Sequence, residues 1–244
     1  MEENYLLAKW LNNEMTAAEL AILKAEPLNI FSPFIDIYKA VLEMPTVMWQ
    51  LFLVYLFQWY AMMCYWQNNS KSIALSVWNV TPKNAVDYEK AVEWNGLIGA
   101  FGFIVTFSIA FYLAKLAKKH GAKMIHFACL LFGAISFLWF PTVQNQYLFF
   151  AVIIGYGIAW ASMMGIPYLM VVAVVPKERY GVYMGIINMM IVIPMIIQNL
   201  SFGYILKNFL DNDPRQAIRF AGVLLVLAAI CTLLIKIKNT KVSE

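Results

Sequence analysis

Six long apolar segments constrain this sequence more than any motif does. Each has about the 20 residues that an α-helix needs to cross the hydrocarbon core of a bilayer. Backbone polar groups cannot stay unpaired in lipid, so segments of this kind are expected to be helical. The predicted spans are 46–68, 94–114, 122–140, 147–174, 182–206 and 216–236.

The composition also indicates a membrane protein. Hydrophobic residues make up 62% of the 244 residues and charged residues only 13%, whereas soluble proteins carry roughly 25% charged residues. The mean hydropathy is +0.66. Cys64, Cys129 and Cys231 all lie within apolar runs and lack metal-ligand spacing, which is typical of small buried side chains. We therefore expect no disulfide framework, no metal site and no cofactor.

The distribution of lysine and arginine predicts the orientation of the spans. Twelve of the 18 basic residues lie in segment 1–44, in the loops at 115–123 and 176–181, and at the C-terminus. The other six are mixed with acidic residues in the loops of the opposite side. We expect a multi-pass protein of the inner (plasma) membrane with both termini in the cytoplasm. The net charge of +4 reflects this bias and gives no indication of nucleic-acid binding.

The chain divides into a polar start, a membrane domain and a short tail. Residues 1–44 are expected to be cytoplasmic, 45–238 to form the six-helix domain, and 239–244 to be a cytoplasmic tail. Ser32-Pro33 is typical of a helix start. The apolar residues that follow have helical spacing, so this helix is expected either to lie on the membrane surface or to pack on the protein. They are Phe34, Ile37, Tyr38, Val41 and Leu42.

The most distinctive part of the sequence lies between residues 165 and 203. Here two apolar spans with internal prolines, Pro167 and Pro194, flank a short basic loop. In the sugar-transporting branch of the major facilitator superfamily, the end of helix ten resembles Gly165–Tyr168 and helix eleven resembles Tyr183–Pro194. More narrowly, these two segments resemble the glycoside–cation symporters, which include plant sucrose transporters. The resemblance covers half of such a transporter.

This resemblance implies a fold and a function. The fold is all-α, with six transmembrane helices as two inverted three-helix repeats, like the C-terminal half of a facilitator. The function is transport of an oligosaccharide or glycoside by alternating access. The implied partners are membrane lipid, the sugar, and either an N-terminal six-helix half or a second copy. Pro167, Pro194 and the Gly181-x-x-x-Gly185 spacing are expected to be structural, the glycines as a packing contact.

Amide and aromatic side chains inside the spans are the candidate substrate groups. Sugars pair their hydroxyls with amides and lay their C–H surfaces on aromatic rings. In the first span, Gln58 and Tyr65 lie on one helical stripe, which ends at Asn69. In the fourth span, Tyr156 and Trp160 lie one turn apart. For each group the alternative is a role in helix packing, and for Asn69, near the outer end, an interfacial position is the simpler interpretation.

Two further patterns leave the same choice open. Asn188 lies deep in the fifth span, where a buried amide needs a partner, so it either clamps two helices or binds the sugar. In the second span, Asn95, Gly99, Gly102 and Thr106 share a stripe of mostly small residues, for which close helix packing is the better explanation.

Missing residues limit the function classes. No carboxylate lies well inside a span, although proton or sodium coupling normally relies on one. Members of the resembling family often carry a Thr-Asp pair near the end of the first span of this half, but here the sequence is Gln67-Asn68-Asn69. No Ser–His pair, His-Glu metal motif or nucleophile motif is apparent, so an enzyme is not expected. The remaining alternatives are a non-transporting structural or assembly subunit and a truncated gene product.

Overall fold

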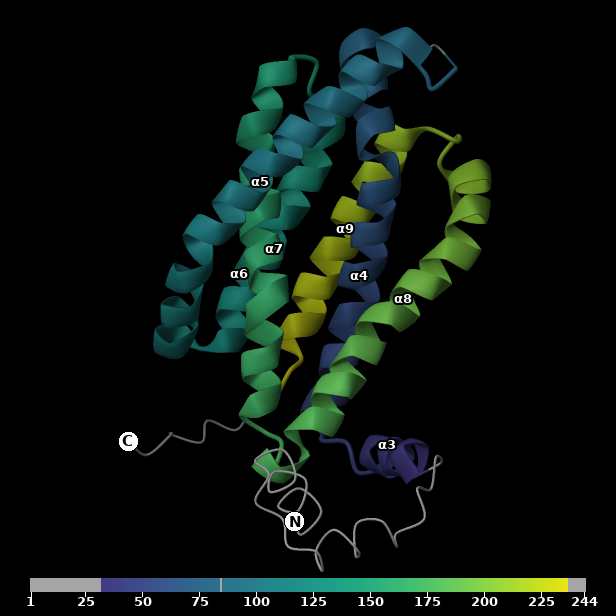
Figure 1. Cartoon of the computed structure of the whole chain (residues 1–244). Coiled ribbons are helices and arrows are strands. Elements are labelled where there is room, and N and C mark those ends of the chain that lie inside the picture. Colours follow the sequence, from purple (N-terminus) through teal and green to yellow (C-terminus); the bar gives the residue numbers. More distant parts are fainter. Residues whose placement is uncertain (1–31, 84, 237–244) are drawn as a thin grey trace, which may run out of the picture.

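A computed structural model describes residues 32–83 and 85–236. Six of its helices are long and apolar enough to cross a membrane, and they alternate in direction along the chain (Figure 1). No β-strand occurs in the described residues, so the expected all-α fold with six spanning helices is confirmed. The six are α4 Thr46–Ile73, α5 Ala85–His120, α6 Ala122–Trp139, α7 Phe149–Val172, α8 Tyr180–Phe209 and α9 Pro214–Leu233.

Short elements connect these helices. A π-helical turn, η1 (Ala74–Trp78), continues α4, and three 3-10 turns occupy loops: η2 (Phe140–Thr142), η3 (Gln146–Leu148) and η4 (Lys177–Arg179). The helix α5 is much longer than the predicted segment 94–114. A hydropathy pattern marks only the part of a helix that lies in hydrocarbon, and polar residues continue α5 beyond it at both ends.

The packing of the helices has an approximate two-fold relation between α4–α6 and α7–α9. The helix α4 packs along α9 as α7 packs along α6, and α5 packs on α7 as α8 packs on α4. The helices α6 and α9 pack on each other. Because successive helices run in opposite directions, the two groups of three are inverted with respect to each other. This is the internal repeat that the sequence resemblance implies.

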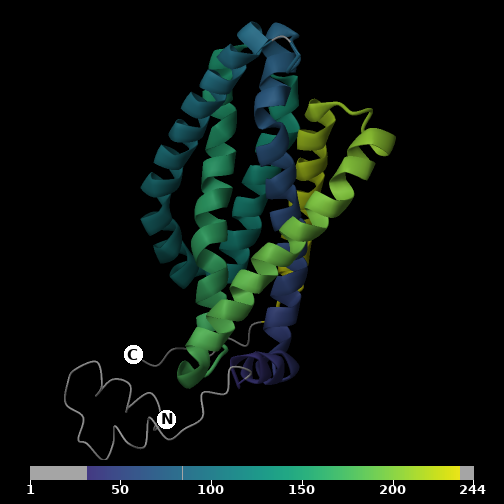
Figure 2. The same cartoon turned by 45° about the vertical axis from the view of Figure 1, so that its right-hand side comes forward.

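One pair departs from this relation. The helix α5 packs directly on α6, whereas α8 has almost no direct packing on its counterpart α9. Figure 2 shows α8 crossing the bundle obliquely rather than running along α9. The consequence is a cavity at the end of the bundle where α8 turns into α9, which is described below.

Glycines bring α5, α6 and α7 close together. A Cβ on Gly155 of α7 would lie 2.4 Å from the carbonyl oxygen of Phe132, and one on Gly157 would lie 2.8 Å from that of Gly102. The hydroxyl of Thr106 donates to the carbonyl oxygen of Gly157 at 3.0 Å. The packing role expected for Gly102 and Thr106 is therefore confirmed.

The glycines and prolines of the 165–203 region have a different setting. A Cβ on Gly181 or Gly185 would meet no atom within 4 Å, so the expected packing contact is not made among the described residues. Pro167 and Pro194 are buried inside α7 and α8, both of which continue through the proline.

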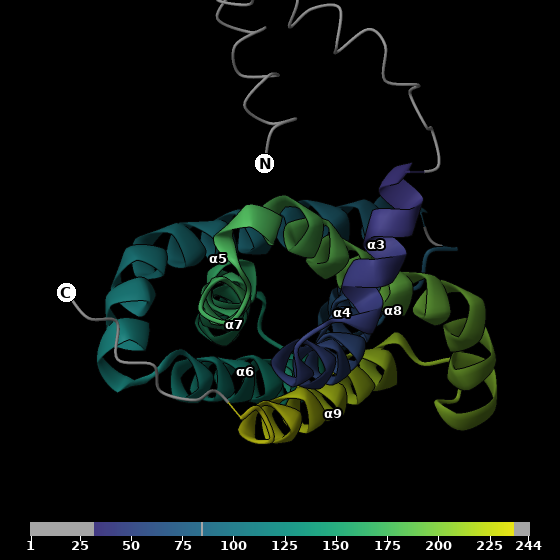
Figure 3. The same cartoon turned by 90° about the horizontal axis from the view of Figure 1, so that it is seen from below.

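The helix α3 (Ser32–Leu42) lies across the ends of α4 and α8, as seen from below in Figure 3. It packs on α8, with Ala40 buried, while Tyr38 and Leu42 stay exposed at 65% and 68%. The helix therefore packs on the protein through part of its apolar face, and a position on the membrane surface stays a prediction. Just after α3, Glu43 accepts a hydrogen bond and ion pair from Arg179, which precedes α8.

Candidate functional site

Four aromatic side chains from α4 and α7 form one cluster, which we call the aromatic platform: Trp59, Trp66, Tyr156 and Trp160. Trp59 and Trp66 are seven residues apart on α4, and Tyr156 and Trp160 are four apart on α7, so each pair shares a helix face. The ring centroids of Trp59 and Trp66 lie 5.8 Å and 5.5 Å from that of Trp160. Tyr156 and Trp160 stack almost in parallel at 6.2 Å.

Polar contacts and a second ring layer hold the platform in place. The indole N–H of Trp66 points to the hydroxyl of Tyr156 at 3.5 Å. Tyr65 stacks on Phe137 of α6 at 4.5 Å, and its ring lies 5.1 Å from that of Tyr156. Such a layered set of rings keeps each face at a fixed position. Trp66 and Trp160 remain only partly buried.

A cavity of about 260 Å³ adjoins the platform between α4, α5 and α7. Asn69 and Asn95 contribute amides, while Gly96 and Gly99 leave room between them. Asn95 is half-buried and makes no hydrogen bond to any residue that the structure describes. The side-chain oxygen of Asn69 accepts a hydrogen bond from the backbone N–H of Ser70 at 2.7 Å. Flat aromatic surface beside these two amides suits a ligand that has both C–H faces and hydroxyls. The remaining lining residues are Tyr65, Trp66, Ala100, Phe103 and Tyr156.

The structure thus brings together three of the residues selected from the sequence, Tyr65, Tyr156 and Trp160. It adds Asn69 and Asn95, for which the sequence favoured an interfacial and a packing role. Helical spacing alone gave Asn95 the same stripe as Gly102 and Thr106. Only the arrangement of α4, α5 and α7 shows that one end of that stripe packs and the other borders a cavity.

Gln58 is placed elsewhere. It is fully buried, and neither atom of its amide group has a hydrogen-bond partner among the described residues. The hydroxyl of Tyr55 and the indole N–H of Trp59, within one turn of Gln58, are likewise unpartnered. Unpaired buried polar groups are costly. Gln58 does not border the cavity next to the platform. Its sugar-binding role stays a prediction that this arrangement of the helices does not support.

Asn188 also lies away from the platform. It is exposed on α8, and its side-chain oxygen accepts a hydrogen bond of 3.3 Å from the hydroxyl of Tyr168 on α7. This bond joins two helices, as the helix-clamp alternative requires.

A second set of amides joins α4 to α8, and we call it the amide cluster: Gln67, Gln198 and Asn199. The amide of Gln67 donates to Asn199 at 3.0 Å, and that of Gln198 donates to Gln67 at 2.9 Å. Gln67 and Asn199 are exposed, whereas Gln198 is buried and its side-chain oxygen is unpartnered. The cluster places polar side chains on an otherwise apolar helix surface.

The fold brings together a serine and a histidine that lie far apart in the sequence. Nδ1 of His126 on α6 lies 2.8 Å from the hydroxyl of Ser162 on α7. Both side chains are fully buried, so no substrate can reach the pair in this arrangement. Among the described residues, no three His, Cys, Asp or Glu side chains form a group that could hold a metal ion.

Comparison with known proteins settles the family. The sequence model of the Major Facilitator Superfamily matches residues 6–199. The chain belongs to this superfamily. No curated protein and no solved structure matches it. Facilitators are membrane transporters, and the six apolar helices and their inverted repeat agree with half of such a transporter.

Proposed function

We propose that this facilitator chain forms one wall of a sugar path, as the C-terminal six-helix half of an alternating-access transporter. The proposal rests on the aromatic platform and on the cavity beside it, which Asn69 and Asn95 line. Ring faces at fixed spacing bind the C–H surface of a pyranose, and Asn69 and Asn95 offer both donors and acceptors to its hydroxyls. An oligosaccharide or glycoside, as the sequence resemblance implies, has several of these faces.

The exposed faces of α5 and α8 support a second six-helix body opposite the platform. Only 17% of the apolar stretch of α5 and 28% of that of α8 is buried, against 50% or more in the other four spans. Both helices flank α4 and α7, which carry the platform. An opposing half packed on α5 and α8 would close the sugar path from its other side.

The proposal includes symport, in which a cation moves together with the sugar. The spans of this chain contain no carboxylate well inside the membrane that could couple the two. Cation coupling in membranes uses intramembrane carboxylates, and Glu93, the acidic residue at a span's edge, is exposed on α5. We therefore assign cation coupling to the opposing half and sugar contact to both.

The test is sugar binding and uptake with the opposing half supplied. Purified protein in proteoliposomes is offered a panel of labelled disaccharides and glycosides, and binding is followed in parallel by tryptophan fluorescence. We expect at least one sugar to be taken up and to change the fluorescence with the same concentration dependence. If no sugar in the panel does either, the structural-subunit alternative is favoured.

The proposed orientation has its own measurement. Single cysteines at Lys118 and Lys177 are introduced after replacing Cys64, Cys129 and Cys231. We expect both to resist an impermeant thiol reagent in intact cells and to react once the membrane is permeabilised. Rapid labelling of both in intact cells would reverse the orientation.

A further inference from the structure

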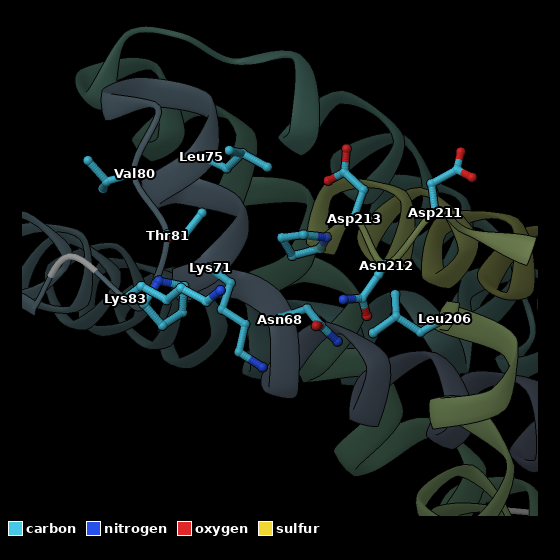
Figure 4. Close-up of a pocket in the computed structure, with 12 residues that line it drawn as sticks. Asn68, Lys71, Leu75, Val80, Thr81, Lys83, Leu206, Asp211, Asn212 and Asp213 are labelled. Carbon is cyan, nitrogen blue, oxygen red and sulfur yellow. The ribbon is translucent and has the colours of Figure 1, made fainter. Parts of the chain in front are cut away.

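The departure from the two-fold relation leaves a cavity of about 610 Å³ at one end of the bundle, which we call the outer pocket. One wall is the end of α4 with the turn after η1, and the other is the turn from α8 to α9 (Figure 4). It lies on the side that the basic-residue distribution assigns to the outside. Neither the sugar site nor the fold assigns it a role.

One wall of the outer pocket carries two exposed lysines and the buried amide of Asn68. Lys71 and Lys83 line it, and neither forms an ion pair with a residue that the structure describes. Asn68 is 3% exposed, and its amide donates to the carbonyl oxygen of Cys64 at 2.9 Å. In Figure 4 the amides of Asn68 and Asn212 point toward one another, with Lys71 next to Asn68 and Lys83 beyond Lys71.

Asp211 and Asp213 also line the outer pocket, on the side away from the two lysines. Asp213 caps α9 and binds the guanidinium of Arg215 at 2.8–3.1 Å. Burial opposes its ionisation, but the hydrogen bonds and charge of Arg215 hold the pKa of Asp213 below its usual value. The carboxylates of Asp211 and Asp213 point away from Asn68 and Lys71 in Figure 4.

The turn that carries Asn212 is fixed by its backbone. Asp211 and Asn212 have φ of 52° and 53°, a left-handed conformation that Asp and Asn tolerate better than other side chains. The backbone N–H of Asn212 donates to the carbonyl oxygen of Leu206 at 2.8 Å. The side chain of Asn212 is therefore held over the pocket opposite Asn68.

We propose that the outer pocket binds a phosphate group. Two ammonium groups supply up to six donors, and the amide of Asn212 adds more, which matches the several oxygens of a phosphate. Lysine is a common point-charge partner of phosphate. The source of the group is either a soluble phosphate or the headgroup of a lipid, because the pocket lies at the end of the spans, near the level of the headgroups.

The test compares phosphate binding by the full chain and by variants with neutral side chains at the two lysines. Thermal unfolding of the purified protein is measured in detergent over a range of inorganic phosphate concentrations, with chloride at equal ionic strength as the reference. We expect Lys71→Gln and Lys83→Gln each to weaken phosphate binding by about tenfold. Lys207→Gln removes a lysine of α8 that does not line the pocket, and it should bind phosphate as the unchanged chain does.

A second experiment, with lipid vesicles, identifies the source of the phosphate group. The same proteins are placed in phosphatidylglycerol vesicles, and bound lipid is counted after extraction into detergent. Retention of phosphatidylglycerol that is lost in the Lys71→Gln/Lys83→Gln double variant, without an effect of inorganic phosphate, supports a lipid headgroup. Stabilisation by inorganic phosphate supports a soluble ligand. The proposal is wrong if neither ligand distinguishes the double variant from Lys207→Gln, or if chloride is as effective as phosphate.

Discussion

Replacing Trp160 by alanine is expected to weaken sugar binding by roughly thirtyfold, the effect of losing about 2 kcal/mol at a central aromatic contact. Trp160 contacts Trp59, Trp66 and Tyr156 at once, so its removal takes away the centre of the aromatic platform. Binding and uptake are measured with the opposing half supplied. Trp160→Phe keeps an aromatic face and should retain most of the affinity.

Trp139→Ala is the matched control. Trp139 is 46% exposed on α6 and does not line the cavity beside the platform. Its loss should change thermal stability little and sugar affinity not at all. Equal affinities for the Trp160→Ala and Trp139→Ala proteins would contradict the role of the platform. The Trp160→Phe protein shows whether any loss follows from the missing ring or from loosened packing of α4 on α7.

Gln58→Ala in the same assay tests whether the sugar contacts the buried amide during transport. Since the amide has no partner in the described residues, its removal is expected to leave sugar affinity unchanged if the path never reaches it. A loss of affinity comparable with that of Trp160→Ala would mean that α4 and α7 separate during transport and expose Gln58 to the sugar.

The helices were predictable because length and hydropathy determine which segments can cross a bilayer. The sites were less predictable, as the stripe of α4 illustrates. Gln58, Tyr65 and Asn69 share one helical face, and periodicity gives them equal weight as site residues. In the structure Gln58 is enclosed, whereas Tyr65 and Asn69 both line the cavity beside the platform. Which part of a stripe is covered depends on neighbouring helices that periodicity does not specify.

The fifth span illustrates the same limit. Its Gly181-x-x-x-Gly185 spacing predicts close packing, yet both positions are open in this structure. The close contacts are made by Gly133, Gly155, Gly157 and Gly222, where a Cβ would lie within 3 Å of a neighbouring atom. A glycine motif shows that a close approach is possible, but the partner surface decides whether it occurs. For Gly181 and Gly185, an opposing half is the partner that the proposed assembly would supply.

The six-helix chain on its own is expected not to accumulate sugar. In the proposed assembly it supplies one wall of the path. The large exposed side chains of α5 and α8, such as Phe107 at 73% and Leu200 at 82%, are not covered by any helix that the structure describes. Gln67, Asn188 and Asn199 are also exposed on this structure, and amides facing lipid are unfavourable. We therefore expect the purified chain to gain thermal stability when the opposing half is added.

The measurement is sugar uptake by proteoliposomes that contain this chain alone, compared with proteoliposomes that also contain the opposing half, under the same proton and sodium gradients. A second copy of this chain is the alternative partner, and it would place two platforms face to face. Such a dimer gives at most downhill equilibration, because doubling the chain adds no intramembrane carboxylate to couple a gradient. Slow equilibration by the chain alone would therefore favour the dimer over the two-half assembly. Gradient-driven accumulation by the chain alone would contradict both, since it requires a coupling group within these six helices.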